Sequence, residues 1–97
     1  MPTFVVGDVH GCADELEDVL SLVGDSRVVL VGDLFTKGPD PIGVWRLIQK
    51  HALEAVLGNH DAALLDVRPD PGGRSIERCV DALDKGADGW RDWVASL

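Results

Sequence analysis

The sequence has little positive charge and no long hydrophobic run. Nine lysines and arginines stand against 17 aspartates and glutamates, which gives a net charge of -8. This balance argues against a surface for duplex nucleic acid, which needs a basic stripe. No basic segment precedes an apolar run at the amino terminus, and no stretch approaches the roughly 20 apolar residues of a membrane span. We therefore expect a cytoplasmic protein that binds neither a nucleic-acid polymer nor a membrane.

Cysteine is also scarce. The two cysteines, Cys12 and Cys79, are far apart in sequence and form no CxxC pair. This pattern favours two reduced thiols in a cytosolic protein, with a single disulfide between them as the alternative. The net negative charge does not exclude a phosphate substrate, because metal ions can reverse the sign of a pocket locally.

The composition that remains is that of one small globular domain. The chain has 97 residues, of which 45% are hydrophobic and 27% charged, with no low-complexity run. That length is enough for one domain and too short for two. We therefore treat residues 1–97 as a single domain.

A pattern repeats three times in the first 66 residues: an apolar run, a glycine-led polar loop and an amphipathic segment. The apolar runs cover residues 3–6, 27–31 and 54–57. They are short, rich in valine and nearly continuous, which is typical of strands buried on both faces in a parallel sheet. The order βαβαβα implies right-handed crossovers and an α/β fold.

The segments between the runs have helical spacing. In the first, Gly24 is placed as a carboxyl-terminal stop, and in the second, Asp40-Pro41 reads as an N-cap and first helical position. Residues 68–74 hold two prolines and two glycines and predict a loop. A helical segment over 75–96 follows, beginning as a capped helix at Ser75, with Trp90 and Trp93 as packing residues.

Each predicted strand is followed by side chains that can bind a metal ion. The first strand is followed by Asp8 and His10 and the second by Asp33, whereas the third is followed by Asn59 and His60, with Asp61 beside them. In an open parallel sheet, ligands bind beyond the carboxyl ends of the strands. We therefore expect these side chains to gather at one edge.

Such a set suits a two-metal hydrolase. Aspartate and histidine hold one ion, and a carboxylate bridges to a second ion about 3.5–4 Å away. A bridging water then loses a proton and attacks phosphorus, while a histidine near the leaving oxygen acts as general acid. Carboxylate, imidazole and amide ligands suit manganese, iron, zinc or a similar divalent ion.

Each residue also has a plainer interpretation. A lone Gly-Asp is usually a turn, and Asn59 alone is more often a helix cap than a ligand. His51 stands at a helix end without a partner motif, so we interpret it as an ordinary surface residue. Three glycine-led loops that all follow strands and all carry ligand types are hard to assign to turns alone, and they favour a metal site.

The three loops resemble the first three signature blocks of the calcineurin-like metallophosphoesterases. The matching segments are Gly7-Asp8-Val9-His10-Gly11, then Gly32-Asp33 through Gly38-Pro39-Asp40, then Gly58-Asn59-His60-Asp61. The resemblance covers residues 3–66, and the Gly-Pro-Asp is similar to the phosphoprotein phosphatase and symmetrical diadenosine tetraphosphatase branch. It implies the amino-terminal half of a four-layer α/β/β/α sandwich.

The resemblance also implies a role for each residue. Asp8 and His10 would bind the first metal, Asp33 would bridge both ions, and Asn59 would bind the second and touch the substrate phosphate. His60 would be the catalytic general acid. The cofactors would be two divalent ions, manganese first, with iron, zinc, cobalt or nickel as alternatives.

The chain departs from the family at Thr36-Lys37, where Asp-Arg is usual. Arginine clamps phosphate bidentately, whereas Lys37 offers only a point charge. The usual aspartate pairs with the catalytic histidine, and Thr36 cannot supply that charge to favour the imidazolium of His60.

A further departure concerns histidines. The family takes at least two more for the second metal from later strands, but the only histidines in this sequence are His10, His51 and His60. We therefore expect the chain to be truncated or a fragment of a longer parent protein. Two functions remain open: a metallophosphatase acting on phosphate monoesters, dinucleoside polyphosphates or phosphoproteins, or a non-catalytic remnant that binds metal or phosphate weakly.

Overall fold

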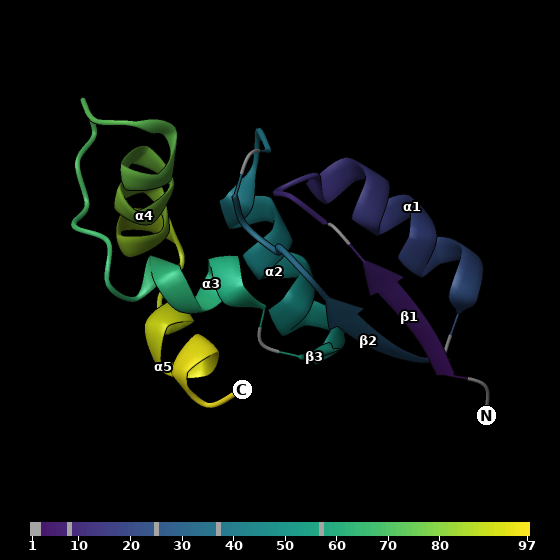
Figure 1. Ribbon diagram of the computed structural model, residues 1–97. Helices are drawn as coiled ribbons and strands as arrows, with labels where there is room; N and C mark the ends of the chain where they lie inside the picture. The colour runs from purple at the N-terminus through teal and green to yellow at the C-terminus, as the bar shows by residue number, and fades with distance from the viewer. Residues whose placement is uncertain (1–2, 8, 25, 37, 57) are drawn as a thin grey trace.

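The computed structural model describes residues 3–7, 9–24, 26–36, 38–56 and 58–97, and for Asn59 and His60 it describes the backbone alone. The elements follow the expected βαβαβα order, with two further helices (Figure 1). They are β1 (Thr3–Gly7), α1 (Ala13–Val23), β2 (Arg27–Val31), α2 (Pro41–His51), β3 (Glu54–Ala55), α3 (Asn59–Leu64), α4 (Ser75–Gly86) and α5 (Trp90–Ala95).

The three strands form one parallel sheet in the order β1-β2-β3. Val5 is opposite Val29, and Val29 is opposite Glu54 on the next strand. The α/β fold class is therefore confirmed. Because right-handed crossovers in a sheet of this order place both helices on one face, α1 and α2 lie on the same side and contact each other.

Local sequence explains where the helices begin and end. Gly24 ends α1 with φ of 60°, in the positive region that glycine tolerates best. The Asp40 Oδ1 accepts a hydrogen bond of 2.8 Å from the Gly43 N–H, and Pro41 follows as the first helical residue. Both expectations for these helix ends are confirmed. In α4 the N-cap is Arg74 rather than Ser75, because Arg74 has the extended backbone and its N–H donates to Glu77 Oε1 at 3.0 Å.

The two faces of the sheet differ in burial. Val28 and Leu30 of β2 point toward the helices and are 5% and 0% exposed, whereas Val5 is 66% and Val56 56% exposed. Side chains alternate along a strand, so Val5, Val29, Val31 and Val56 share the other face. We call these four valines the open face.

The expectation that the strands are buried on both faces is therefore wrong for this chain. Both crossover helices lie on one side, and among the described residues no element packs over the open face. The near-continuous apolar runs mark strands that suit two buried faces, but the 97 residues cover only one of them.

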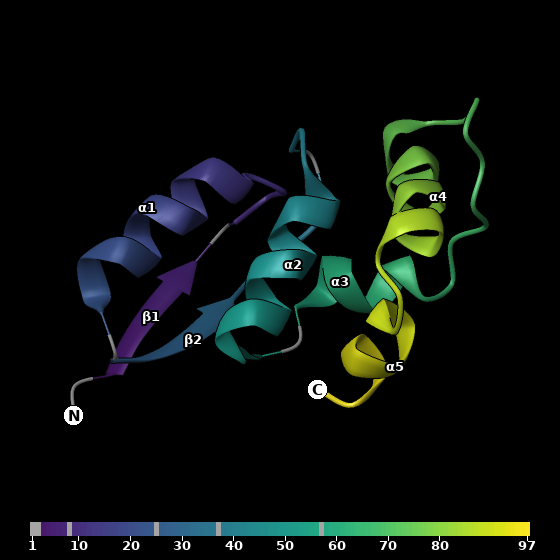
Figure 2. The same cartoon turned by 180° about the vertical axis from the view of Figure 1, so that it is seen from behind.

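The last two helices extend the fold away from the sheet (Figure 2). Helix α4 packs against α2, and α5 packs against α3. Trp90 is 2% exposed and meets Phe35 edge to face, with ring centroids 6.4 Å apart. Trp93 meets Trp45 in the same way, with centroids 5.6 Å apart, so the predicted packing role of both tryptophans is confirmed.

Cys12 and Cys79 are both free thiols. Among the described residues, no helix combines the length and the apolar character that crossing a bilayer would require.

An ion pair joins α4 to α5 and gives a pH-dependent contribution to stability. Both carboxylate oxygens of Asp84 accept hydrogen bonds from Arg91, at 2.9 and 2.8 Å, and Oδ1 also accepts from the Trp90 indole N–H at 2.8 Å. The hydrogen bond from Arg91 is the main cause of a lowered pKa of Asp84, although partial burial opposes it. Because the pKa is depressed, this stabilisation is present above the unfolded-state pKa of about 3.9 and is lost as pH falls through the folded-state pKa.

We predict that Asp84→Asn lowers the free energy of unfolding by about 1 kcal/mol at pH 7, a modest value because the pair is partly exposed to solvent. Urea denaturation at pH 7 and at successively lower pH should show the difference from wild type shrinking below about pH 4. Asp88→Asn, at an exposed position between α4 and α5, is the matched control and should be neutral. Equal stability of wild type and Asp84→Asn at pH 7 would contradict the prediction.

Candidate active site

The first two glycine-led loops are joined by their backbones at the carboxyl edge of the sheet. The His10 N–H donates to the Asp33 carbonyl oxygen and the Gly11 N–H donates to the Leu34 carbonyl oxygen, both at 2.8 Å. His10 and Gly11 have positive φ values of 49° and 68°, which turn the first loop back over the second. The two loops are therefore held as one unit.

The segment after the second loop returns to the first. The Asp40 N–H donates to the Gly11 carbonyl oxygen at 2.9 Å. A Cβ atom on Gly38 would lie 1.4 Å from the His10 carbonyl oxygen, so the backbone of Gly38 occupies space that no side chain could share. The Gly38-Pro39-Asp40 segment thus supports the loop that carries His10, a role that sequence reasoning did not assign to it.

The third loop is joined to the second through Gly58 and Asp61. A Cβ atom on Gly58 would lie 3.1 Å from the Gly32 carbonyl oxygen, which shows how closely the two backbones approach. The Asp61 side chain is fully buried, and its Oδ1 accepts a hydrogen bond of 3.0 Å from the Leu34 N–H. All three loops therefore meet around the backbone of Asp33 and Leu34.

Two predicted metal ligands lie close together. The His10 Nδ1 and the Asp33 Oδ2 are 3.7 Å apart, and their side chains are 31% and 16% exposed. Two donors that each lie about 2.1 Å from one ion are at most about 4.2 Å apart. The His10–Asp33 pair is therefore close enough to share one divalent ion, and the Nδ1 atom of His10 is shielded from solvent.

Four predicted site residues fall wholly or partly outside the described part of the chain. Asp8 and Lys37 lie outside the described residues, and so do the side chains of Asn59 and His60. The backbone of Asn59 and His60 begins α3 directly after Gly58. Within the described part of the chain, no group of three or more His, Cys, Asp or Glu side chains is arranged to hold a metal ion.

Near the loops, Thr36 is buried and Cys79 is half-buried. Thr36 is 6% exposed, and its hydroxyl oxygen has no hydrogen-bond partner among the described residues. The Cys79 Sγ–H of α4 donates to the Phe35 carbonyl oxygen at 3.4 Å. Burial, followed by the nearby charge of Asp61, raises the pKa of Cys79 to about 11. Cys79 is therefore a protonated thiol at neutral pH and not a nucleophile.

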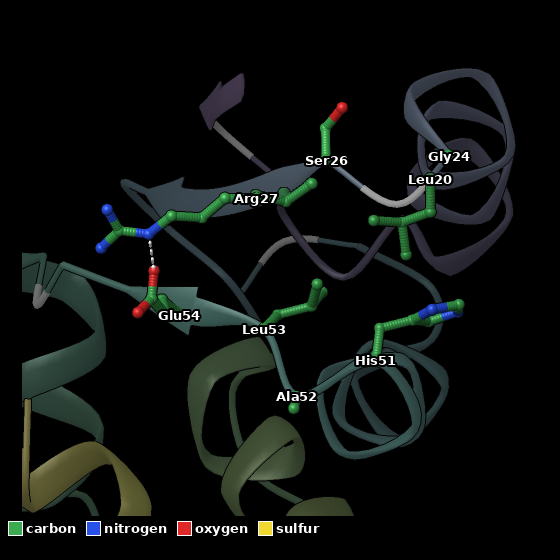
Figure 3. Close-up of a pocket in the computed structure, with 9 residues that line it drawn as sticks. Leu20, Gly24, Ser26, Arg27, His51, Ala52, Leu53 and Glu54 are labelled. Atoms are coloured by element: carbon green, nitrogen blue, oxygen red, sulfur yellow. Dashed lines mark hydrogen bonds and ion pairs between the residues drawn. The ribbon is translucent and has the colours of Figure 1, made fainter. Parts of the chain in front are cut away.

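A cavity of about 440 Å³ lies at the opposite edge of the sheet, where β2 and β3 begin (Figure 3). The Arg27 guanidinium is turned toward the carboxylate of Glu54, with which it pairs. His51 is exposed on the rim, in agreement with its interpretation as a surface residue. Because the cationic group of Arg27 is already paired and the cavity is remote from the three loops, we do not assign the active site to it.

The chain belongs to the calcineurin-like phosphoesterase family, whose profile matches residues 1–94. The resemblance inferred from the three loops is therefore confirmed. Among curated relatives, the symmetrical bis(5'-nucleosyl)-tetraphosphatase of Proteus mirabilis is 44% identical over 73 residues, covering 69% of this chain and 27% of the relative. The enzyme of the same name from Erwinia tasmaniensis is 36% identical over 91 residues, covering 87% of this chain and 33% of the relative.

The fold also matches that of a solved structure. The crystal structure of a protein assigned as a diadenosine tetraphosphatase matches with a TM-score of 0.70 and 33% identity, covering 98% of this chain and 42% of that chain. The matched regions thus span between a quarter and a third of these two curated relatives and less than half of the solved chain.

Proposed function

We propose that residues 1–97 are the amino-terminal part of the catalytic domain of a metal-dependent phosphoesterase that hydrolyses dinucleoside polyphosphates. The observation that carries this proposal is the His10–Asp33 pair, 3.7 Å apart where three family-type loops meet. The substrate class is supported by the relatives named as symmetrical tetraphosphatases.

The site residues take the roles that the family implies. Asp8 and His10 hold a first ion, Asp33 bridges to a second, and Asn59 binds the second ion and the substrate phosphate. When bound, two divalent ions supply positive charge to the phosphoryl oxygens and lower the pKa of a water molecule. Lys37 attracts the phosphate as a point charge.

His60 is proposed to donate the proton to the leaving oxygen. Its immediate neighbour in sequence, Asp61, is fully buried and accepts from the Leu34 N–H.

Manganese is the proposed ion, and carboxylate, imidazole and amide ligands also suit iron, zinc, cobalt or nickel. The two free thiols, Cys12 and Cys79, support a reducing compartment, and we propose the cytoplasm.

The test is hydrolysis by the parent protein of diadenosine tetraphosphate and of a chromogenic phosphomonoester, with and without added manganese. We expect metal-dependent cleavage of the dinucleotide and loss of activity when a chelator removes the ions. Binding of manganese without hydrolysis of either substrate would favour the non-catalytic remnant. Faster cleavage of the monoester would contradict the proposed substrate class.

We predict that the double substitution Thr36→Asp and Lys37→Arg raises kcat/KM about tenfold in the parent protein. Arginine would clamp phosphate bidentately, and aspartate would supply charge to His60, both mainly in the transition state. Since Thr36 is 6% exposed, an aspartate there is tolerated only if it gains a charged partner. Thermal denaturation should accompany the kinetics. A clear loss of activity in a stable variant would mean that the pocket is built around Thr36 and Lys37.

A further inference from the structure

The backbone of Leu34 lies at the junction of the three loops. Its carbonyl oxygen accepts from the Gly11 N–H of the first loop at 2.8 Å. Its N–H donates to Asp61 Oδ1, behind the third loop, at 3.0 Å. The neighbouring Asp33 carbonyl oxygen accepts from the His10 N–H at 2.8 Å. The two consecutive peptide units on either side of the Leu34 Cα atom therefore set the position of the first two loops relative to the third.

Asp61 is the side chain that completes this junction. It is 0% exposed, and the hydrogen bond to Leu34 joins residues 27 positions apart in sequence. A buried carboxylate is costly unless it is hydrogen-bonded, so its hydrogen bond to Leu34 opposes displacement of the loop. Asp61 also lies on the same first turn of α3 as Asn59 and His60. A shift of Asp61 would therefore move Asn59, a proposed ligand of the second ion, relative to Asp33, the proposed bridge between the two ions.

We infer that Asp61 is a positioning residue that holds the Asp33 loop against the start of α3, so that the ligands from separate strands reach a common pair of ions. The inference rests on the proposed metal site. We assign this role to the hydrogen bond that Asp61 accepts from the Leu34 N–H. Residues that orient metal ligands in this way typically contribute about 10-fold to 100-fold to metal affinity or activity.

The experiment compares three variants of the parent protein. Asp61→Ala removes the acceptor, whereas Asp61→Asn keeps a carbonyl oxygen at nearly the same place. Asp66→Ala, at an exposed position just after α3, is the matched control. The readouts are the exchange rate of the Leu34 amide hydrogen, the manganese affinity by titration with the metal alone, and kcat and KM measured below the melting temperature of each variant.

We expect Asp61→Ala to speed Leu34 amide exchange, weaken manganese binding about tenfold and lower kcat more than KM changes. Asp61→Asn should restore manganese affinity to within about threefold of wild type, and Asp66→Ala should match wild type. Unchanged manganese affinity in folded Asp61→Ala would overturn the inference. So would a loss of manganese affinity in Asp61→Asn equal to that in Asp61→Ala. A wild-type protein that binds manganese without hydrolysing phosphate would refute the proposed function and leave the Asp61 measurements interpretable.

Discussion

Asp33→Asn is expected to abolish phosphoester hydrolysis in the parent protein, with a loss of about a thousandfold or more in kcat. The physical reason is that Asp33 is the proposed bridge between two ions, and a neutral amide offers one weak donor oxygen where the carboxylate offers two charged ones. Its Oδ2 already lies 3.7 Å from His10 Nδ1, the other described candidate ligand. At least one ion should therefore be lost with the substitution.

Metal analysis by mass spectrometry and steady-state kinetics on the same preparation would check this prediction. The matched control is Asp40→Asn, because Asp40 is an aspartate near the same loops whose Oδ1 caps α2. An asparagine is an equally good N-cap, so this variant should retain its ions and its activity. Two ions per chain and normal turnover in Asp33→Asn would end the assignment of Asp33 as the bridge.

The sequence pattern predicted the strands and the helix ends better than it predicted the contacts that position the site residues. Valine-rich runs and glycine-led loops identified all three strands, and Gly24 and Asp40 were correctly placed at helix ends. These signals are local, since they depend on a periodicity or on a residue with a special backbone preference. β3 is shorter than its apolar run suggested, with only Glu54–Ala55 assigned as strand.

Local sequence patterns did not predict the contacts that hold the site together. Asp61 was noted only as a residue beside the histidine, yet it accepts from Leu34, 27 positions away. Gly38 was part of a recognised motif without a structural reason, and the reason is its close approach to the His10 carbonyl oxygen. Both effects depend on how separate loops pack, and no single segment of sequence contains that information.

The open face links the fold to the behaviour of these 97 residues on their own. Val5 and Val56 are 66% and 56% exposed, and they share this face with Val29 and Val31. Exposed apolar side chains that share one face of a sheet promote self-association. The outer strand β1 adds an unpaired edge, which offers backbone groups to another chain. We therefore predict that residues 1–97, expressed alone, self-associate in solution.

Size-exclusion chromatography with light scattering would measure this association, and two variants test whether the open face causes it. Val5→Thr with Val56→Thr makes the open face more polar and should shift the protein toward monomer. Leu22→Thr is the control, because Leu22 is 86% exposed on α1, away from the open face. Monomeric behaviour of the unmodified residues 1–97, or equal effects of the two variants, would contradict the role given to the open face.

The same 97 residues should show no metal-dependent phosphatase activity, and this is the larger effect. The proposed first ion has Asp8, His10 and Asp33 as ligands, and water can complete its coordination. The proposed second ion has only Asp33 and Asn59, and two oxygen donors hold a transition ion weakly. Without a second ion, no symmetric clamp stabilises the attacking and leaving oxygens.

Isothermal titration with manganese should therefore find at most one weak site, and an assay with diadenosine tetraphosphate should give no signal above the metal-only rate. A folded sample of residues 1–97 that binds two ions and turns over substrate would refute the ligand count for the second ion.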